Sequence, residues 1–176
     1  MQKIFVTGGT GGLGTFVVDA LSHDYECVVL GRDLATDVNG AHALVHLAGG
    51  FGTDWTKMLD ANIAFAAKAF DALVPRLADG GRIVAISSYA TISKPAGLGA
   101  YVASKAALNA LVEVSAKQLA SRRITVNALL PSSLDTPAMQ DSKEPRVPLD
   151  RVAATIRFLL GDDAASITGG LIPLLP

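Results

Sequence analysis

Short apolar runs alternate along this chain with longer segments in which apolar residues recur every three or four positions. The runs are partly β-branched and end at glycine, serine or proline, as buried strands do. The longer segments have the period of helices that pack on one face. We therefore predict an α/β fold, an open parallel sheet of about six strands with helices on both faces. The predicted strands are 3–7, 26–30, 43–47, 83–86, 124–130 and 167–174, and the predicted helices are 15–21, 55–77, 101–121 and 149–160.

The stretch between the second and third predicted strands is unusually short. Residues 33–43 number eleven, whereas a parallel crossover that contains a helix takes about a dozen or more. The stretch is still long enough to return across the sheet as a loop. We expect one face of the sheet to lack a helix there. We also expect a partner subunit to cover that face, because large apolar areas rarely stay exposed on monomers.

Length and composition fit a single domain, residues 1–176, that acts on small molecules. The 15 lysines and arginines nearly balance the 16 aspartates and glutamates, so there is no basic field for nucleic acid or an anionic membrane surface. The single cysteine, Cys27, cannot form an internal disulfide, and no apolar segment is long enough to cross a bilayer. We predict a cytoplasmic protein without a metal site.

A glycine-rich turn joins the first strand to the first helix. Glycines let the backbone turn sharply and approach a diphosphate, while a helix amino terminus offers free N–H groups and a partial positive charge. A flexible turn alone would look similar, but the strand before it and the helix after it favour a phosphate-binding loop. The residues predicted to form this loop are Gly8, Thr10, Gly11, Gly12, Leu13 and Gly14.

Three polar residues near the middle of the chain indicate acid–base chemistry. Ser88 comes just after the strand 83–86, and ligands bind at the carboxyl ends of parallel strands. Tyr101 and Lys105 lie four residues apart at the start of a predicted helix, so both side chains project from one face. A nearby ammonium favours the phenolate, so we expect Lys105 to lower the pKa of Tyr101. Alone, this spacing also fits an ordinary amphipathic helix.

Taken together, these motifs resemble the short-chain dehydrogenase/reductase family. The order of TGGTGGLG, ISS and YVASK is similar to that family from residue 3 to about residue 170. The resemblance implies an NAD(P)-dependent oxidoreductase that transfers a hydride between nicotinamide and a carbonyl or secondary alcohol of a small molecule. It implies that Tyr101 exchanges the proton, that Lys105 also binds the nicotinamide ribose and that Ser88 binds the substrate oxygen. It also implies that Asn62 holds a relay water, although a helix–helix hydrogen bond is the alternative role.

The resemblance further implies how the adenine half of the cofactor is bound. Relatives place a helix, a strand and another helix where this chain has 33–43, so the crossover helices and one strand should be shortened or missing. Gly31 occupies the place of an acidic ribose ligand and Arg32 follows it, which favours NADP over NAD. The pair that touches adenine is either Asp33–Leu34 or Asp37–Val38, and we favour the latter.

The nicotinamide half is assigned in the same way. Ala48 and Gly49, which follow the third strand, should let the ribose approach the backbone closely. Pro131 ends a later strand, and the resemblance implies that the Leu134 backbone and the Thr136 hydroxyl bind the nicotinamide carboxamide. Tyr101 and Lys105 would also contact this half. His46 lies within a predicted buried strand and is expected to be a packed, hydrogen-bonded histidine rather than a catalytic one.

Departures from the family pattern leave two alternatives. Leu47 and Ser132 stand where relatives carry asparagine and glycine, which would fit a catalytically silent NADP(H)-binding sensor or scaffold. The run from His46 to Gly49 also resembles sugar-nucleotide epimerases and dehydratases, which carry a further carboxy-terminal domain. Residues 138–147 would form at most a small flap over the site. We expect a homodimer or homotetramer.

Overall fold

Six parallel strands form one sheet within residues 1–136 and 145–176, which are the residues that the computed structural model describes. The strand order is β2-β1-β3-β4-β5-β6, so β2 and β6 are the edges. The first two strands pair in register from Gln2↔Tyr25 to Thr7↔Leu30. The strands are β1 Gln2–Thr7, β2 Tyr25–Leu30, β3 Ala41–His46, β4 Leu77–Ile86, β5 Thr125–Pro131 and β6 Leu171–Leu174.

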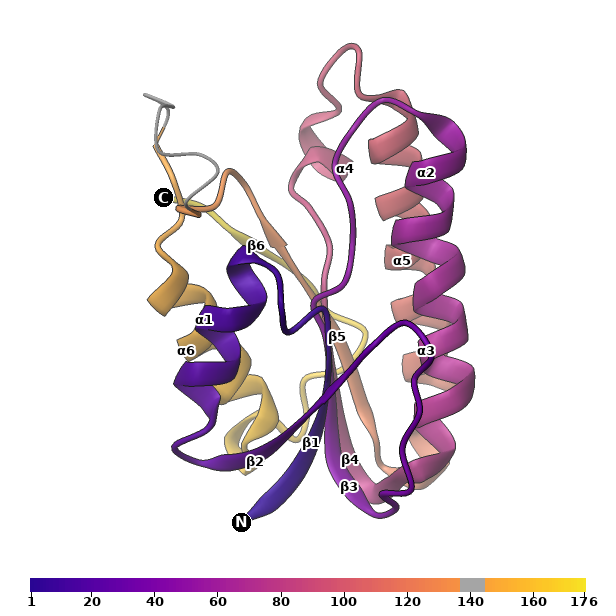
Figure 1. The fold of residues 1–176 in the computed structure, drawn as a ribbon, viewed down its shortest axis with the longest axis vertical. Helices are drawn as coiled ribbons and strands as arrows, with labels where there is room; N and C mark the ends of the chain where they lie inside the picture. The colour runs from indigo at the N-terminus through magenta and orange to yellow at the C-terminus, as the bar shows by residue number, and fades with distance from the viewer. Residues whose placement is uncertain (137–144) are drawn as a thin grey trace.

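Helices cover both faces of this sheet. On one face lie α1 and α6, and on the other lie α2, α3 and α5, as Figure 1 shows. A five-residue π-helical segment, Asp60–Ala64, joins α2 to α3. The helices are α1 Gly12–Leu21, α2 Trp55–Leu59, α3 Phe65–Leu73, α4 Ala90–Ser93, α5 Gly99–Gln118 and α6 Leu149–Leu160, with short 3₁₀ turns at Val74–Arg76, Ala120–Arg122 and Asp162–Ala164.

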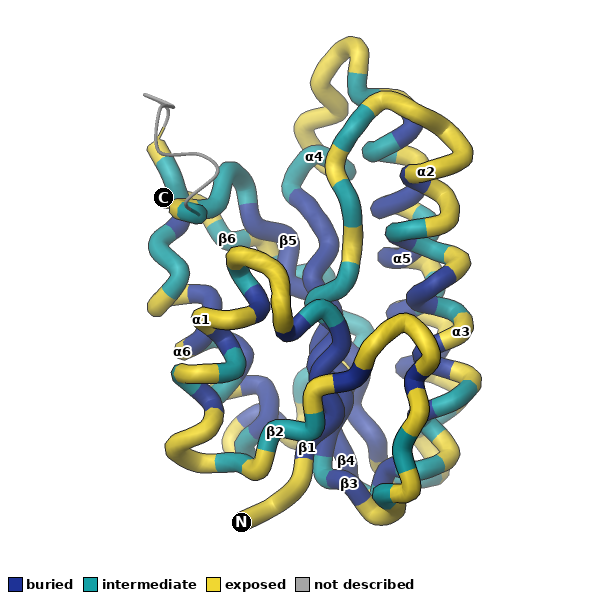
Figure 2. The backbone as a smooth tube through the Cα atoms, viewed as in Figure 1, coloured by how far each residue is buried: buried dark blue, intermediate teal, exposed yellow. Residues whose placement is uncertain are grey.

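The alternation of side chains along the strands builds a separate apolar core on each face. Ile4 and Val6 of β1 pack toward α1 and α6, whereas Phe5 packs toward α3 and α5. The central strands are therefore buried on both sides, as their continuous apolar runs predict, and Figure 2 shows this buried band through the middle of the molecule. The edge strand β2 is only partly buried.

The predicted elements are confirmed, with shifts at their ends that have local causes. The predicted helix 55–77 ends at Leu73, because Pro75 cannot continue it, and β4 begins as early as Leu77. The extra length of β4 contains an irregularity in its pairing with β3, close to Gly80, whose φ is +77°. Among the described residues, no helix is both long and apolar enough to span a membrane.

The predicted loss of the crossover helices is also confirmed, because residues 31–40 contain neither helix nor strand. The expected bare face is nevertheless partly covered by this loop itself. Leu34 is buried in the core beside α3, and Val38 packs against the same core. Leu34 adopts a left-handed conformation, with φ of 58°, which is unusual for a leucine. The chain's own loop thus provides cover that we expected from a partner subunit.

Candidate active site

The glycine turn between β1 and α1 folds tightly against the end of β3. A Cβ at Gly8, where φ is +74°, would lie 2.5 Å from the Ala48 nitrogen, and one at Gly14 would lie 2.0 Å from the Gly8 oxygen. No side chain caps the start of α1, where Gly11 is the N-cap. The first N–H groups of α1 are therefore available to an anionic ligand.

This turn forms one wall of a cavity of about 450 Å³. Its position at the carboxyl ends of β1, β2 and β3 is where ligands bind to open parallel sheets. The cavity and the tight glycine backbone fit an extended diphosphate ligand such as a dinucleotide. The lining contains these predicted cofactor residues: Gly8, Thr10, Gly11, Gly12, Leu13, Gly14, Arg32, Ala48 and Gly49.

The preferred adenine pair, Asp37 and Val38, does not line this cavity. After Arg32 the loop runs back toward the amino ends of the strands, where the Gly40 nitrogen donates to the Arg76 carbonyl at 2.8 Å. Asp37 is exposed on this return path, and Val38 packs into the core. The alternative pair, Asp33–Leu34, does not line the cavity either, so which pair touches adenine stays a prediction.

Pro131, Leu134 and Thr136 lie beyond the cavity lining, at the carboxyl end of β5. The Pro131 carbonyl accepts from the Tyr89 nitrogen at 2.9 Å, which ties β5 to the segment after Ser88. Leu134 pairs with Val147 in an isolated bridge, and its carbonyl accepts from the Thr136 nitrogen at 2.9 Å. Their roles toward nicotinamide stay predictions. Most of the predicted flap, 137–144, lies outside the described residues.

Ser88 lies beside Tyr101, next to the end of β4, close enough for its hydroxyl to affect the pKa of the phenol. The Ser88 hydroxyl also accepts from the Ala90 nitrogen at 3.1 Å, which fixes it at the start of α4. Burial raises the pKa of Tyr101, and the Ser88 hydroxyl beside the phenol opposes this rise. The net shift is therefore a rise rather than the expected lowering, because burial of the phenol is the dominant influence.

Lys105 is buried one helical turn after Tyr101. Its Nζ donates to the Ile86 carbonyl at 2.9 Å, and burial lowers its pKa from 10.5 to about 8. A Cβ at Gly49 would lie 2.9 Å from this Nζ and 2.7 Å from the Asn62 Oδ1. A larger residue at this position would clash with both side chains, so the position requires a glycine. Because Gly49 also lines the cavity, it connects Lys105 to that cavity.

Asn62 lies in the π-helical segment and joins three parts of the chain. Its Oδ1 accepts from the Gly50 nitrogen at 2.8 Å, and its Nδ2 donates to the Gly50 carbonyl at 3.0 Å and to the Ser104 hydroxyl at 3.0 Å. The amide therefore clamps the loop after β3 to α5, which matches the structural alternative. Extra π turns are frequent at functional sites, but the water-holding role stays a prediction.

His46 is a packed core residue, as expected. Its Nδ1 shares a hydrogen bond of 2.8 Å with the Thr7 hydroxyl, and its ring lies near Phe65 and Phe70. Burial, and then the nearby Lys105, lower its pKa to about 3. The ring is therefore neutral at physiological pH.

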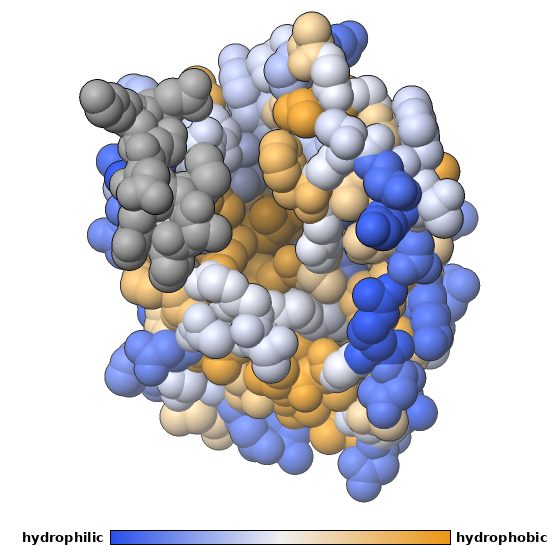
Figure 3. Space-filling view, turned by 45° about the horizontal axis from the view of Figure 1, so that its top comes forward, coloured by the Kyte–Doolittle hydropathy of each residue, from blue (hydrophilic) through white to orange (hydrophobic). Residues whose placement is uncertain are grey.

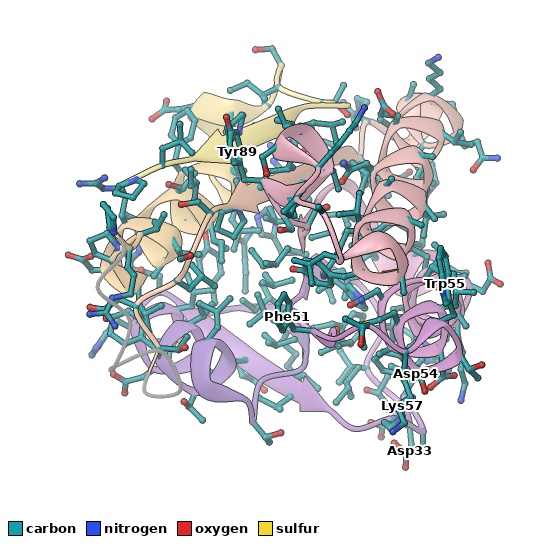
Figure 4. The ribbon with its side chains drawn as sticks, turned by 90° about the horizontal axis from the view of Figure 1, so that it is seen from above. Asp33, Phe51, Asp54, Trp55, Lys57 and Tyr89 are labelled. Carbon is teal, nitrogen blue, oxygen red and sulfur yellow. The ribbon has the colours of Figure 1, made fainter. Side chains whose placement is uncertain are left out.

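Sequence reasoning missed several aromatic and small residues of the site. The ring of Phe51 stands edge-on to Tyr101 with centroids 5.0 Å apart, yet 72% of Phe51 is exposed. Figure 4 shows Phe51 near the centre of this end of the molecule, and Figure 3 shows a hollow lined by hydrophobic residues there. No pattern marks an aromatic residue within a glycine-rich loop. The cavity also includes Leu30, Gly31, Leu47, Ala61 and Phe65.

Comparison with known proteins agrees with this arrangement. The profile of a family described as Enoyl-(Acyl carrier protein) reductase matches residues 30–174. Fold and site together define a Rossmann-type protein with a glycine-rich cavity at the carboxyl ends of its strands. The chain belongs to the short-chain dehydrogenase/reductase family.

Individual relatives show how far the likeness extends. The chain is 36% identical over 132 residues to dehydrogenase/reductase SDR family member 4 of Bos taurus, covering 65% of this chain and 47% of that protein. It is 32% identical over 134 residues to a 3-oxoacyl-(acyl-carrier-protein) reductase of Thermotoga maritima, covering 68% and 54%. The chain thus spans about half the length of the curated relatives it matches.

A solved short-chain type dehydrogenase/reductase from Mycobacterium ulcerans superposes with a TM-score of 0.86 at 21% identity. The superposition covers 98% of this chain and 88% of that one. At this identity the likeness concerns the fold.

Proposed function

We propose that the protein is an NAD(P)-dependent oxidoreductase that reduces a carbonyl group, or oxidises a secondary alcohol, of a small molecule. One observation carries the proposal. Ser88 and Tyr101 lie beside each other, the buried Lys105 follows Tyr101 by one helical turn, and Gly49 connects that lysine to the glycine-rich cavity. A relative from Arabidopsis thaliana, 35% identical over 109 residues, is named an NADPH-dependent aldehyde reductase-like protein, which supports the same chemistry.

The residues divide the work between binding and proton transfer. The glycine turn and the amino terminus of α1 would hold the diphosphate, and the bound nicotinamide would supply or accept the hydride. The Ser88 hydroxyl would position the substrate oxygen, and Tyr101 would give a proton to that oxygen during reduction. Lys105, with its pKa near 8, is largely protonated at neutral pH, so it can stabilise negative charge that develops on the phenol.

Turnover is tested with NADPH or NADH and a panel of aldehydes and ketones, by following the loss of reduced nicotinamide absorbance. We expect Tyr101→Phe to lower kcat by about 10²- to 10⁴-fold, because the proton donor is removed. Dinucleotide binding should stay within about twofold of wild type, because the cavity is unchanged. Tyr25→Phe, at the opposite end of the sheet, is the matched control.

Two results would count against this proposal. If Tyr101→Phe kept wild-type turnover, the assignment of the proton donor would be wrong. Dinucleotide binding without turnover of any carbonyl compound would favour the silent sensor or scaffold instead. The preference for NADP, the assembly into a homodimer or homotetramer and the cytoplasmic location are further parts of the proposal.

A further inference from the structure

Arg32 lines the cavity and forms an ion pair with a carboxylate. Its Nη2 lies 2.8 Å from the Asp60 Oδ2, and its guanidinium carbon lies 5.4 Å from the centre of the Phe65 ring. Phe65 lines the same cavity. The planar cation is therefore held between an aromatic face and an acidic partner, so it is oriented before any ligand arrives.

Asp60 lies at an irregularity in the helix. It is the first residue of the π-helical segment, in which Ala61 lines the cavity. The Asp60 side chain keeps 63% of its surface exposed and the Arg32 side chain keeps 71%. An ion pair this exposed contributes little to the stability of the fold. Its main effect is therefore on Arg32 itself, whose guanidinium it orients and pairs with a negative charge.

The other charges around Arg32 almost cancel. Lys68 donates from Nζ to the Arg32 carbonyl at 3.2 Å and brings a second positive charge. Asp33 brings a second negative charge, because its Oδ1 lies 3.3 Å from where a Cβ of Gly31 would be. Figure 4 shows Asp33 at the periphery of this end of the molecule. Among these four side chains, Arg32 and Lys68 are matched by Asp60 and Asp33.

This balance matters because the two nicotinamide cofactors differ in charge at one position. A 2′-phosphate adds about −1.5 to −2 charges, and a carboxylate beside the cation that binds it repels these charges. A 2′-hydroxyl has no such charge and can donate to a carboxylate. A carboxylate paired with Arg32 therefore penalises the phosphorylated cofactor and leaves the other unaffected.

We propose that Asp60 determines cofactor choice by occupying Arg32. The preference for a 2′-phosphate is then weaker than Arg32 alone would give. Removal of the Asp60 charge should strengthen that preference. The inference rests on the proposed function, because it concerns the same dinucleotide site.

The proposal is tested by calorimetric titration of the full chain with NADPH and NADH, without any turnover measurement. We expect Asp60→Asn to tighten NADPH binding by about threefold to tenfold, the size of effect that exposed ion pairs produce. NADH binding should change by less than about twofold. Asp71→Asn removes the same charge from an exposed position on α3 and should change neither affinity.

The double variant Asp60→Asn with Arg32→Ala identifies the mechanism. If Asp60 acts through Arg32, the gain in NADPH affinity disappears in the double variant. A gain that persists there, a gain shared equally by NADH, or no gain at all would overturn the inference while leaving the proposed function in place. If the wild-type chain binds neither dinucleotide, the proposed function fails, and the inference fails with it.

Discussion

The two ends of the cavity edge are built in opposite ways. At the catalytic end Ser88, Lys105 and Asn62 are buried, and each is fixed by hydrogen bonds to backbone or to neighbouring side chains. At the proposed adenine end Arg32 and Asp60 are exposed, and the crossover from β2 to β3, which contains Arg32, is a loop of ten residues, 31–40. In the proposed function, buried core residues would carry out the chemistry at one end, whereas surface charges would select the ligand at the other. Substitutions at the catalytic end should therefore change stability and turnover together.

The largest expected effect is that of Lys105→Met, which should sharpen this contrast. A pKa that burial lowers from 10.5 to about 8 corresponds to a cost of roughly 3 kcal/mol for the charged lysine at neutral pH. Met fills similar space without charge but leaves the Ile86 carbonyl without its donor. We expect the free energy of unfolding at pH 7 to rise by about 1–2 kcal/mol while turnover falls at least about 10²-fold.

The pH dependence of stability provides the check. The folded state binds fewer protons than the unfolded state between about pH 8 and 10.5, so wild-type stability should rise with pH across this window. Lys105→Met should lack that rise in urea denaturation, and Lys117→Met on the exposed side of α5 should keep it. A Lys105→Met protein clearly less stable than wild type at pH 7 would mean that the hydrogen bond to Ile86 outweighs the cost of burial.

The second prediction tests whether the loop of residues 31–40 also contributes to the core. Leu34 is only 6% exposed, so Leu34→Ala should cost about 2–4 kcal/mol of unfolding free energy. Because φ at Leu34 is 58°, glycine relieves strain of about 1 kcal/mol that alanine retains. Leu34→Gly should therefore be at least as stable as Leu34→Ala, the reverse of the usual order.

Urea denaturation of both variants decides this point. Leu59→Ala, at a position that is 42% exposed, is the control and should cost under about 1 kcal/mol. If Leu34→Ala were as mild as this control, the loop would not be part of the core, and the adenine end would need cover from a partner subunit after all.

The sequence predicted those features that depend on periodicity and on short-range order. The apolar runs determine the strands, and the glycines between a strand and a helix define the diphosphate loop before any contact is known. The choice between Asp33–Leu34 and Asp37–Val38 as the adenine contact stays a prediction, because no pattern tells where an irregular loop turns back. The pairing of Arg32 with Asp60 joins residues 28 positions apart, and spacing alone could not identify it. The pKa of Tyr101 was misjudged because sequence spacing shows a neighbouring charge but not burial.

The smallest expected effect concerns Phe51, which covers Tyr101 from the open side. Its ring stands edge-on to the phenol at 5.0 Å, and burial is the main cause that raises the pKa of Tyr101. Phe51→Ala should hydrate the phenol and lower its pKa, so the limb of the pH–rate profile that Tyr101 controls should move to lower pH. The rate at the optimum should change by less than about tenfold, in line with the worth of one aromatic contact. Phe51→Leu, which keeps an apolar cover, should leave the limb near its wild-type position. A Phe51→Ala pH–rate profile that superposes on that of wild type would show that core packing alone shields Tyr101 from water. Phe51 would then have no part in that shielding.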